Sequence, residues 1–352
     1  MRNLWLIALT AIGALFQNGC MTKSVEQNEF RAVWLHPGLF SQNETTASNQ
    51  IDSLFDIYHK SGINNLFCYN AMTGDNSFEW DYLQLLINKG HKRDIKIHPI
   101  FYPGYEVNLE KIQPDHPDWL IRDLGGKYLP FYNLANPEVC KYWLTKIKEA
   151  LKYDIDGIHI DYMRFPTTQL YSYDNLTCEA FKKEFGYSPL NVSHDCGSMI
   201  WCEWIKWNAR QVTILVSEIR QTINSSGKNV MFGIDVFPDL ETSKILIAQD
   251  WGKWAQSGLV DFICPMLYTN DLKLFRDYIQ NAKSATQGKC QVYPGIGVHT
   301  SHNTITKELI IKEVLITRDL KTNGMAFFSA NSFNKEMRDT LQVSLFNRNY
   351  IR

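Results

Sequence analysis

Short runs of apolar residues recur along the chain, and each ends in glycine, proline or polar residues. Runs of this length with such boundaries are typical of buried β-strands. Because the pattern repeats through the whole chain, it indicates one regular architecture. The eight runs are FRAVWLHPG (from Phe30), INNLFCYNA (from Ile63), IKIHPIFYPGY (from Ile95), GIHIDYMRF (from Gly157), NVMFGIDVFP (from Asn229), DFICPMLYTN (from Asp261), CQVYPGIGVH (from Cys290) and GMAFFSANS (from Gly324).

Amphipathic stretches lie between these runs, with apolar residues at i, i+3, i+4 and i+7, the period of a helix. Alternating strands and helices predict an α/β fold, a single-domain (β/α)8 TIM barrel whose parallel strands are buried on both faces. An open, doubly wound sheet is the alternative, but no glycine-rich phosphate loop follows the first strand. The expected helices cover 50–61, 81–93, 138–153, 204–224, 242–257, 272–285, 306–323 and 334–346.

Two connections are much longer than the others, at 106–154 after the third strand and 167–228 after the fourth. Both leave the carboxyl end of a strand, which is the catalytic face of such a barrel. Long loops on one face either shape a binding cleft or are decorative. We therefore expect any ligand cleft to lie beside these two loops.

The N-terminus has the pattern of a secretory signal, with Arg2, an apolar run over 4–16 and small or polar residues before Cys20. The run is too short for a comfortable membrane span. We interpret residues 1–20 as a bacterial lipoprotein signal with Cys20 as the lipid-anchored residue, 21–29 as a tether and 30–350 as the barrel. This predicts an exported protein anchored in the bacterial cell envelope, in the outer membrane or periplasm. An uncleaved signal anchor is the alternative.

The formal net charge of the 352-residue chain is -1. Proteins that bind nucleic acid usually carry a basic surface, so no nucleic-acid partner is expected. Aromatic residues make up 13% of the chain, and their faces suit sugar rings as well as protein cores. The cysteines after Cys20 are irregularly spaced and predict neither a disulfide framework nor a zinc site.

Two carboxylates interrupt otherwise apolar strands, in GIHIDYM and FGIDVF. Strand alternation places His159 and Asp161 on one face, and Ile158 and Ile160 on the other. A buried carboxylate without a partner is costly, and Asp235 lies in the neighbouring strand, so we expect both aspartates to point into the barrel mouth. Glycoside hydrolysis uses such a pair, one carboxyl to protonate the leaving oxygen and one to attack or to activate water. A purely structural ion pair of Asp161 is the alternative.

Further candidates lie at other strand ends. Glu106 is a third acid, further into its loop. Neither His98 nor His159 has a partner pattern that indicates a metal site, so no metal and no cofactor are predicted. The absence of a Gly-x-Ser-x-Gly motif disfavours an esterase. The candidates for substrate binding are Arg164, Tyr268, His36, Trp34, Asn70, Tyr102, His159 and Asn331, with Tyr69 and Tyr105 as further rings for stacking.

Four motifs resemble those of the glycosyl hydrolase-like 10 family: RAVWLHP, HPDWLIRDLGGK, NLANPEV and DGIHIDYMRFP. The resemblance runs from about Phe30 to about Ser332. Tyr162 stands where many members have a second aspartate, which weakens any scheme that needs two adjacent aspartates. The resemblance implies a (β/α)8 barrel of glycosidase type, often secreted or lipid-anchored in bacteria. It also implies amino-sugar glycans, including peptidoglycan strands, as the substrate class.

We therefore expect a glycoside hydrolase that acts on an extracellular or envelope polysaccharide. Asp161 would be the nucleophile or charge stabiliser and Asp235 the acid/base, with Glu106 as the substitute for either. Arg164 and Tyr268 would hold the sugar or tune Asp161. The alternative is a non-catalytic glycan-binding lipoprotein on a degenerate glycosidase barrel.

Overall fold

The computed structural model describes residues 29–105, 108–167, 171–194, 197–333, 335–342 and 346. The expected signal sequence, Cys20 and the tether lie outside these residues, apart from Glu29. Across these ranges, no helix combines the length and the apolar character that a membrane crossing requires.

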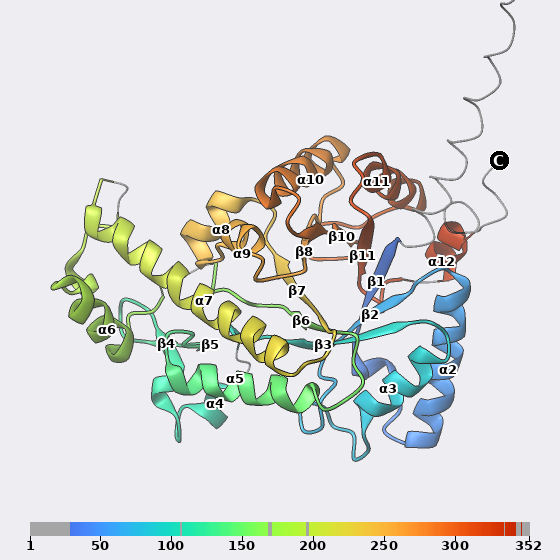
Figure 1. The fold of residues 1–352 in the computed structure, drawn as a ribbon, viewed down its shortest axis with the longest axis horizontal. Coiled ribbons are helices and arrows are strands. Elements are labelled where there is room, and N and C mark those ends of the chain that lie inside the picture. The colour runs from blue at the N-terminus through green and yellow to red at the C-terminus, as the bar shows by residue number, and fades with distance from the viewer. Residues whose placement is uncertain are drawn as a thin grey trace, which may run out of the picture.

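Nine of the described strands form a curled parallel sheet with helices around it (Figure 1). The order is β10-β11-β1-β2-β3-β6-β7-β8-β9, which confirms the predicted α/β class with parallel strands. The strands of this sheet are β1 (Phe30–Leu35), β2 (Asn65–Cys68), β3 (Lys96–Phe101), β6 (Gly157–Ile160), β7 (Met231–Val236), β8 (Phe262–Pro265), β9 (Gln291–Val292), β10 (Gly295–Gly297) and β11 (Gly324–Phe328).

All eight predicted strands are present, but the seventh is divided into β9 and β10. Tyr293 and Pro294 separate the two parts, and Pro294 has no N–H to continue a strand ladder. The part before the break pairs with β8, and the part after it pairs with β11. The two ends of the sheet order are therefore successive pieces of chain.

The helices follow the strands as the apolar period predicts, and side chains fix where they begin. Asn43, Asp81 and Asp271 each accept a hydrogen bond from the first turn of a helix, which satisfies an otherwise unpaired N–H. The helix expected over 242–257 is broken, because Ala248 takes a left-handed conformation with φ 58°. The helices are α2 (Glu44–Lys60), α3 (Tyr82–His91), α4 (Leu109–Ile112), α5 (Pro137–Ala150), α6 (Asn175–Phe185), α7 (Met199–Ser225), α8 (Leu240–Ile247), α9 (Trp251–Gln256), α10 (Leu272–Thr286), α11 (Lys307–Asp319) and α12 (Lys335–Leu341).

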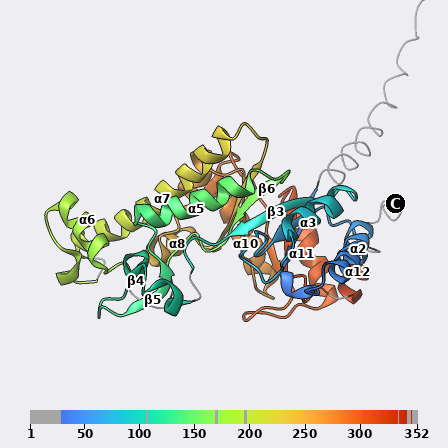
Figure 2. The same cartoon turned by 90° about the horizontal axis from the view of Figure 1, so that it is seen from below.

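The two long connections build a lobe that projects to one side of the sheet (Figure 2). The third connection forms the antiparallel hairpin β4 (Leu120–Arg122) and β5 (Tyr128–Tyr132). Its turn contains Gly126 at φ 84°, which glycine adopts without steric cost. The apolar period predicts neither this hairpin nor α6, because both lie inside the long connections, outside the repeat of strand and helix that builds the sheet. The aromatic cluster that joins α6 to the first half of α7 comprises Tyr173, Cys178, Phe181, Trp204 and Trp207.

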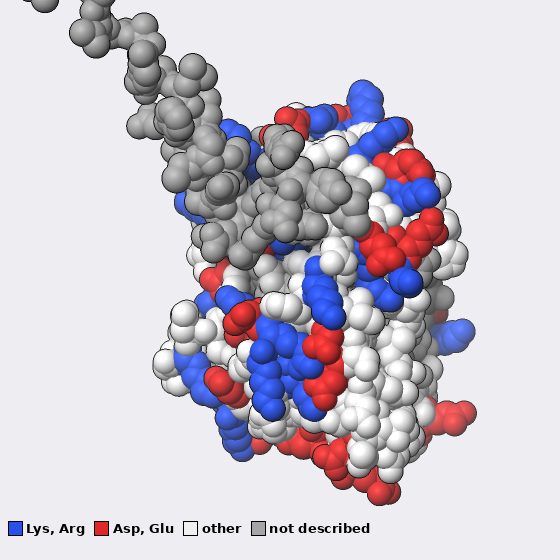
Figure 3. All heavy atoms as spheres, turned by 90° about the vertical axis from the view of Figure 1, so that its right-hand side faces the viewer, with Lys and Arg blue, Asp and Glu red and all other residues white. Residues whose placement is uncertain are grey.

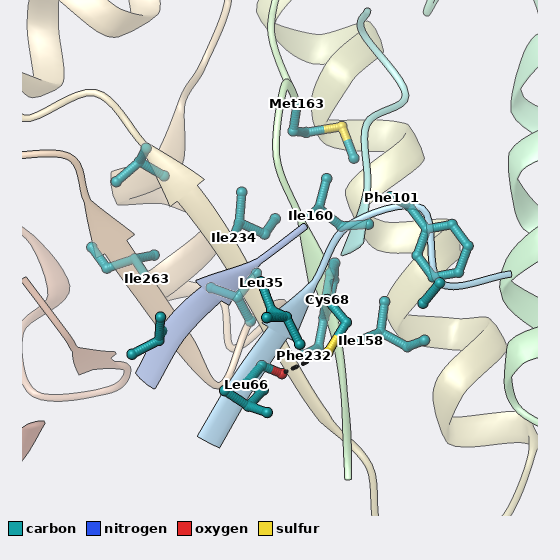
Figure 4. Close-up of a cluster of buried hydrophobic side chains, with 14 of the residues drawn as sticks. Leu35, Leu66, Cys68, Phe101, Ile158, Ile160, Met163, Phe232, Ile234 and Ile263 are labelled. Atoms are coloured by element: carbon teal, nitrogen blue, oxygen red, sulfur yellow. Dashed lines mark hydrogen bonds between the residues drawn. The ribbon is translucent and has the colours of Figure 1, made fainter. Parts of the chain in front are cut away.

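Side chains along each strand alternate between two cores. Ala32 and Trp34 belong to the core inside the curl, whereas Val33 and Leu35 face the helices. The predicted alternation on β6 is confirmed, since Ile158 and Ile160 lie in the core between sheet and helices (Figure 4). His159 and Asp235 are consequently turned toward the inside of the sheet, where both are fully buried.

On α11, the side chain of Glu313 is 0% exposed, and neither carboxyl oxygen has a hydrogen-bond partner within the described ranges. Burial raises the pKa of Glu313 to about 9. Between pH 4.5 and 9 this residue is therefore ionised in the unfolded chain but protonated in the folded one. Linkage then lowers the free energy of unfolding by about 1.4 kcal/mol for each pH unit in that window, about 3 kcal/mol by pH 7.

Glu313→Gln should remove this loss. We expect the variant to match the wild type near pH 4.5 and to become the more stable protein as the pH rises toward 9. Urea unfolding at several pH values measures the difference. Lys312→Gln, an exposed change on the same helix, is the control and should alter stability little at any pH in this window. A difference for Glu313→Gln that stays constant with pH would contradict the assignment.

Acidic and basic side chains are interspersed over the face shown in Figure 3, without one large region of a single sign. Between α2 and α3, Arg93 pairs with Asp52 and Asp56, and Lys89 also pairs with Asp52. Surface pairs of this kind, even when partly buried, contribute little stability individually. Their relevance is that they balance the charge of the helical surface.

Candidate active site

A cleft of about 930 Å³ opens at the carboxyl ends of the strands. Asp161 directly follows β6, and Asp235 lies on the adjacent strand β7. Both carboxyl groups are thus delivered to one cleft from neighbouring strands. The cleft is lined by His36, Tyr69, Asn70, Tyr102, Tyr105, Asp161, Tyr162, Arg164, Asp235, Phe237, Pro238, Met266, Tyr268, Thr269, Leu274, Tyr278, Thr300, Ser301, His302 and Phe328.

Three donors converge on the carboxylate of Asp161. The Tyr69 hydroxyl donates to Oδ2 at 3.2 Å, and Arg164 Nη1 donates to Oδ1 at 3.2 Å. The backbone N–H of Tyr162 donates to Oδ1 at 2.6 Å. Tyr162 has φ 51°, a left-handed conformation that costs free energy in a residue with a side chain. The arrangement presents Asp161 purely as an acceptor, as an ionised carboxylate requires.

Arg164 is held between two aromatic rings. Its guanidinium carbon lies 4.2 Å from the ring centroid of Tyr162 and 4.9 Å from that of Phe237. Cation–π contacts of this kind favour a partly desolvated guanidinium. Arg164 therefore supplies a fixed positive charge next to Asp161, and its charge also acts on Asp235.

Asp235 has a different environment. Its Oδ2 accepts a hydrogen bond from Trp34 Nε1 at 3.2 Å, and its Oδ1 lies 2.9 Å from His159 Nε2. Burial, and next the negative charge of Asp161, raise the pKa of Asp235 well above its usual range, although the Trp34 hydrogen bond and Arg164 oppose this. Gln249 donates to the backbone carbonyl of Asp235 at 3.2 Å, which fixes the strand end.

Trp34 and His159 form the layer beneath the cleft. Their side chains are fully buried. The imidazole of His159 stacks on Phe67 with 3.9 Å between ring centroids and an interplanar angle of 7°. Burial lowers the pKa of His159 to about 3, so the ring is neutral near pH 7.

His159, Asp235 and Cys264 bring one potential metal-ligating atom each to within 4.8 Å of one another. Zinc would require a thiolate and a carboxylate at this position. Burial raises the pKa of both the Cys264 thiol and the Asp235 carboxyl, and the charge of Asp235 adds to the effect on Cys264. His159 and Asp235 already satisfy one another by a hydrogen bond. The imidazole and the carboxyl group therefore act as each other's hydrogen-bond partners in this structure.

The structure brings nine of the predicted residues together as cleft lining: Asp161, Asp235, Arg164, Tyr268, His36, Asn70, Tyr102, Tyr69 and Tyr105. It places Trp34 and His159 below the cleft, in contact with Asp235 rather than with the space above it. Asn331 is exposed and is not among the lining residues. Glu106 lies outside the described residues.

Several lining residues are not evident from strand-end positions. Tyr278 comes from the body of α10, and Thr300, Ser301 and His302 come from the loop after β10. Tyr69 was assigned by its aromatic character to stacking, whereas its hydroxyl donates to Asp161. The run of polar residues after GIGVH is the one sequence signal that indicates the contribution of that loop.

Comparison with known proteins agrees with this architecture. The sequence model of the family "Glycosyl hydrolase-like 10" matches residues 30–305. The chain is 22% identical to the glycosyl hydrolase YngK of Bacillus subtilis, over 93% of this chain and 74% of that protein. It is 24% identical to the glycosyl hydrolase DigH of Escherichia coli, over 54% of this chain and 46% of that protein.

Among solved structures, the glycoside hydrolase domain of PgaB (BpsB) from Bordetella bronchiseptica is similar with a TM-score of 0.72. The similarity covers 89% of this chain and 98% of that domain, at 11% sequence identity. At this identity the likeness concerns the fold. The curled parallel sheet is therefore of the type found in glycosidases.

Proposed function

Because the chain belongs to the glycosyl hydrolase-like 10 family, we propose that it is a glycoside hydrolase and that Asp161 and Asp235 catalyse the reaction. The observation that carries the proposal is the contrast between the two carboxyl groups. Asp161 accepts three hydrogen bonds beside a cation, while burial and the charge of Asp161 raise the pKa of Asp235. Two carboxyl groups in opposite environments are the arrangement that separates a base or nucleophile from an acid.

In this scheme Asp161 is the nucleophile or charge stabiliser, and Asp235 protonates the leaving oxygen. Arg164 holds Asp161 in place. Tyr268 stacks on Phe328 with 5.4 Å between ring centroids. Burial and the charges of Asp235 and Asp161 raise the pKa of its phenol, which keeps the hydroxyl protonated as a donor to a sugar oxygen.

The proposed substrate is an extracellular or envelope polysaccharide, with amino-sugar glycans such as peptidoglycan strands as the first choice. The aromatic lining of the cleft supports a carbohydrate, because aromatic faces contact the apolar faces of sugar rings. The signal pattern with Cys20 supports an exported, lipid-anchored protein of the cell envelope.

We further propose that the curled sheet closes as a complete (β/α)8 barrel, with β9 and β10 as two parts of one strand. Met266 bridges Gly295 in parallel, and Leu267 N donates to Gly295 O at 3.0 Å. These contacts support continuity across the break at Pro294.

The decisive test is incubation of the purified protein with a panel of amino-sugar and plant glycans, scored by mass spectrometry. Shortened products that carry one added water for each cleavage are expected, and they should be absent with a double variant, Asp161→Asn with Asp235→Asn. Binding without products would instead identify a glycan-binding protein on a degenerate glycosidase fold.

Tyr69→Phe removes one donor to Asp161 and leaves the ring in place. A hydrogen bond to a charged group contributes about 1.5–3 kcal/mol, so we expect kcat/KM to fall by roughly tenfold to a hundredfold. Steady-state kinetics measure the loss. Tyr102→Phe, a cleft tyrosine for which no bond to either aspartate is found in the described ranges, is the control. Equal losses in the two variants would contradict a specific role for the Tyr69 hydroxyl.

A further inference from the structure

We infer that His159 is a positioning residue for Asp235: protonated at Nε2, it donates to Oδ1 and, together with Trp34, holds the carboxyl group in the orientation it needs toward the substrate. The inference rests on the proposed function, in which Asp235 is the acid/base. It gives His159 a role without sugar contact, because the side chain is fully buried below the cleft.

The surroundings of Nδ1 select this tautomer. The imidazole lies on Phe67 and also stacks with Phe262, at 5.6 Å between ring centroids and 16°. Nδ1 is buried and has no hydrogen-bond partner in the part of the chain described. A buried N–H without an acceptor is rarer in proteins than a buried acceptor without a donor. The single proton of the neutral ring therefore belongs on Nε2, which lies 2.9 Å from Oδ1 of Asp235.

The second carboxyl oxygen of Asp235, Oδ2, faces the indole N–H of Trp34, which can act only as a hydrogen-bond donor. An indole N–H can donate but cannot accept, so Oδ2 accepts from Trp34 at 3.2 Å. Both donors approach from buried positions on β1 and β6, and they hold the carboxyl group in one orientation without help from the substrate. His159 and Trp34 therefore fix the orientation in which the Asp235 carboxyl meets the substrate.

Four titratable groups surround His159. Asp161 directly follows β6, the strand of His159, whereas Asp235 lies on β7, Cys264 on β8 and His98 on β3. Among the described residues, Asp235 is the only one of these that hydrogen-bonds to the ring. A change in the pH profile of kcat/KM after substitution of His159 should therefore reflect the loss of its hydrogen bond to Asp235.

His159→Phe tests the inference, because it retains a ring against Phe67 and removes the donor. Loss of a hydrogen bond to the ionised carboxyl raises the pKa of Asp235. We expect the basic limb of the kcat/KM profile to move to higher pH by about one unit and kcat to fall roughly tenfold or more. His159→Gln, which can still donate, should restore most of both. A shift of the limb to lower pH would overturn the inference, since it would mean that His159 accepts the carboxyl proton. An unmoved limb would overturn it as well.

His98→Phe is the matched control. His98 is also fully buried and lies against Phe67, and its Nδ1 likewise lacks a partner in the described ranges. Its Nε2, however, bonds to Asn65 and to no carboxyl group in the described ranges. The basic limb should remain where it is in this variant. Melting temperatures of all three variants separate a loss of folding from a change in the site.

A second measurement needs no turnover. In wild-type protein labelled with 15N-histidine, the His159 signals, identified by their absence in His159→Phe, should show a protonated Nε2 and a bare Nδ1. A proton on Nδ1 would overturn the inference directly. If the protein cleaved no glycan at all, the proposed function would fail while this tautomer assignment could still hold, so the two failures are distinguishable.

Discussion

Asp161→Asn should reduce kcat on the glycan substrate by about a thousandfold or more while changing its affinity little. The amide cannot attack the sugar or stabilise its positive charge, and one of its two polar atoms is a donor that would face Arg164, Tyr69 or the N–H of Tyr162. Single-turnover kinetics give the chemical step, and calorimetric titration gives the affinity.

Asp156→Asn offers a matched control at the other end of the same strand. Asp156 accepts from the backbone N–H of Ile97 at 2.8 Å and contacts His91 at 2.9 Å, which are structural contacts far from the cleft lining. It should lose some thermal stability but keep kcat within about twofold, since structural changes remote from the reacting atoms leave transition-state contacts intact. Near-normal turnover in Asp161→Asn would exclude Asp161 as nucleophile or stabiliser.

Asp235→Asn should slow hydrolysis of the natural glycan by about 10²–10⁴-fold, the usual contribution of a general acid. The loss should be far smaller on aryl glycosides with acidic leaving groups, because such groups depart without protonation. The raised pKa of Asp235 also predicts how the activity of the wild-type protein depends on pH. Activity that requires the protonated carboxyl persists above the usual pKa range of an aspartic acid and declines as the pH rises through the pKa of Asp235.

The variant should lack this decline on the aryl substrate. Cleavage rates of a series of aryl glycosides, plotted against the pKa of the leaving phenol, measure both effects. A steep dependence in Asp235→Asn with a shallow one in the wild type supports the acid role. Identical slopes would exclude it, and Glu106 would then be the acid to test next.

The fold was largely predictable because the strands of a parallel sheet have a strong local signal. Runs such as that from Gly324 to Phe328 are apolar on both sides and end in polar residues, and the helices between the runs keep the helical period. The break in the seventh strand was not predicted, because it depends on the single residue Pro294. The residues on both sides of Pro294 continue the apolar pattern of a strand. The lobe was not predictable, because its aromatic cluster joins side chains within the connection after β6, where the chain does not follow the repeat of strand and helix.

The site was predictable where strand alternation alone decides the direction of a side chain. This rule places Asp161 and Asp235 together from two separate strands. It does not specify how far along the inside of the sheet a side chain lies from the cleft. This distance separates Tyr268, which lines the cleft, from Trp34 and His159, which are buried below it. Nor does it reveal the backbone N–H of Tyr162, since that donor depends on a left-handed conformation rather than on a residue type.

Helix α7 belongs to both halves of the molecule. Trp204 and Trp207 near its start lie in the aromatic cluster of the lobe, whereas Val212, Leu215 and Ile219 lie in the core against the sheet. One unbroken helix of 27 residues thus crosses the junction. A domain joined by a flexible linker can change its orientation. The lobe, in contrast, is connected through a continuous helix, so it cannot change its orientation unless this helix bends or its buried aromatic rings are exposed. The lobe and the sheet therefore behave mechanically as a single body.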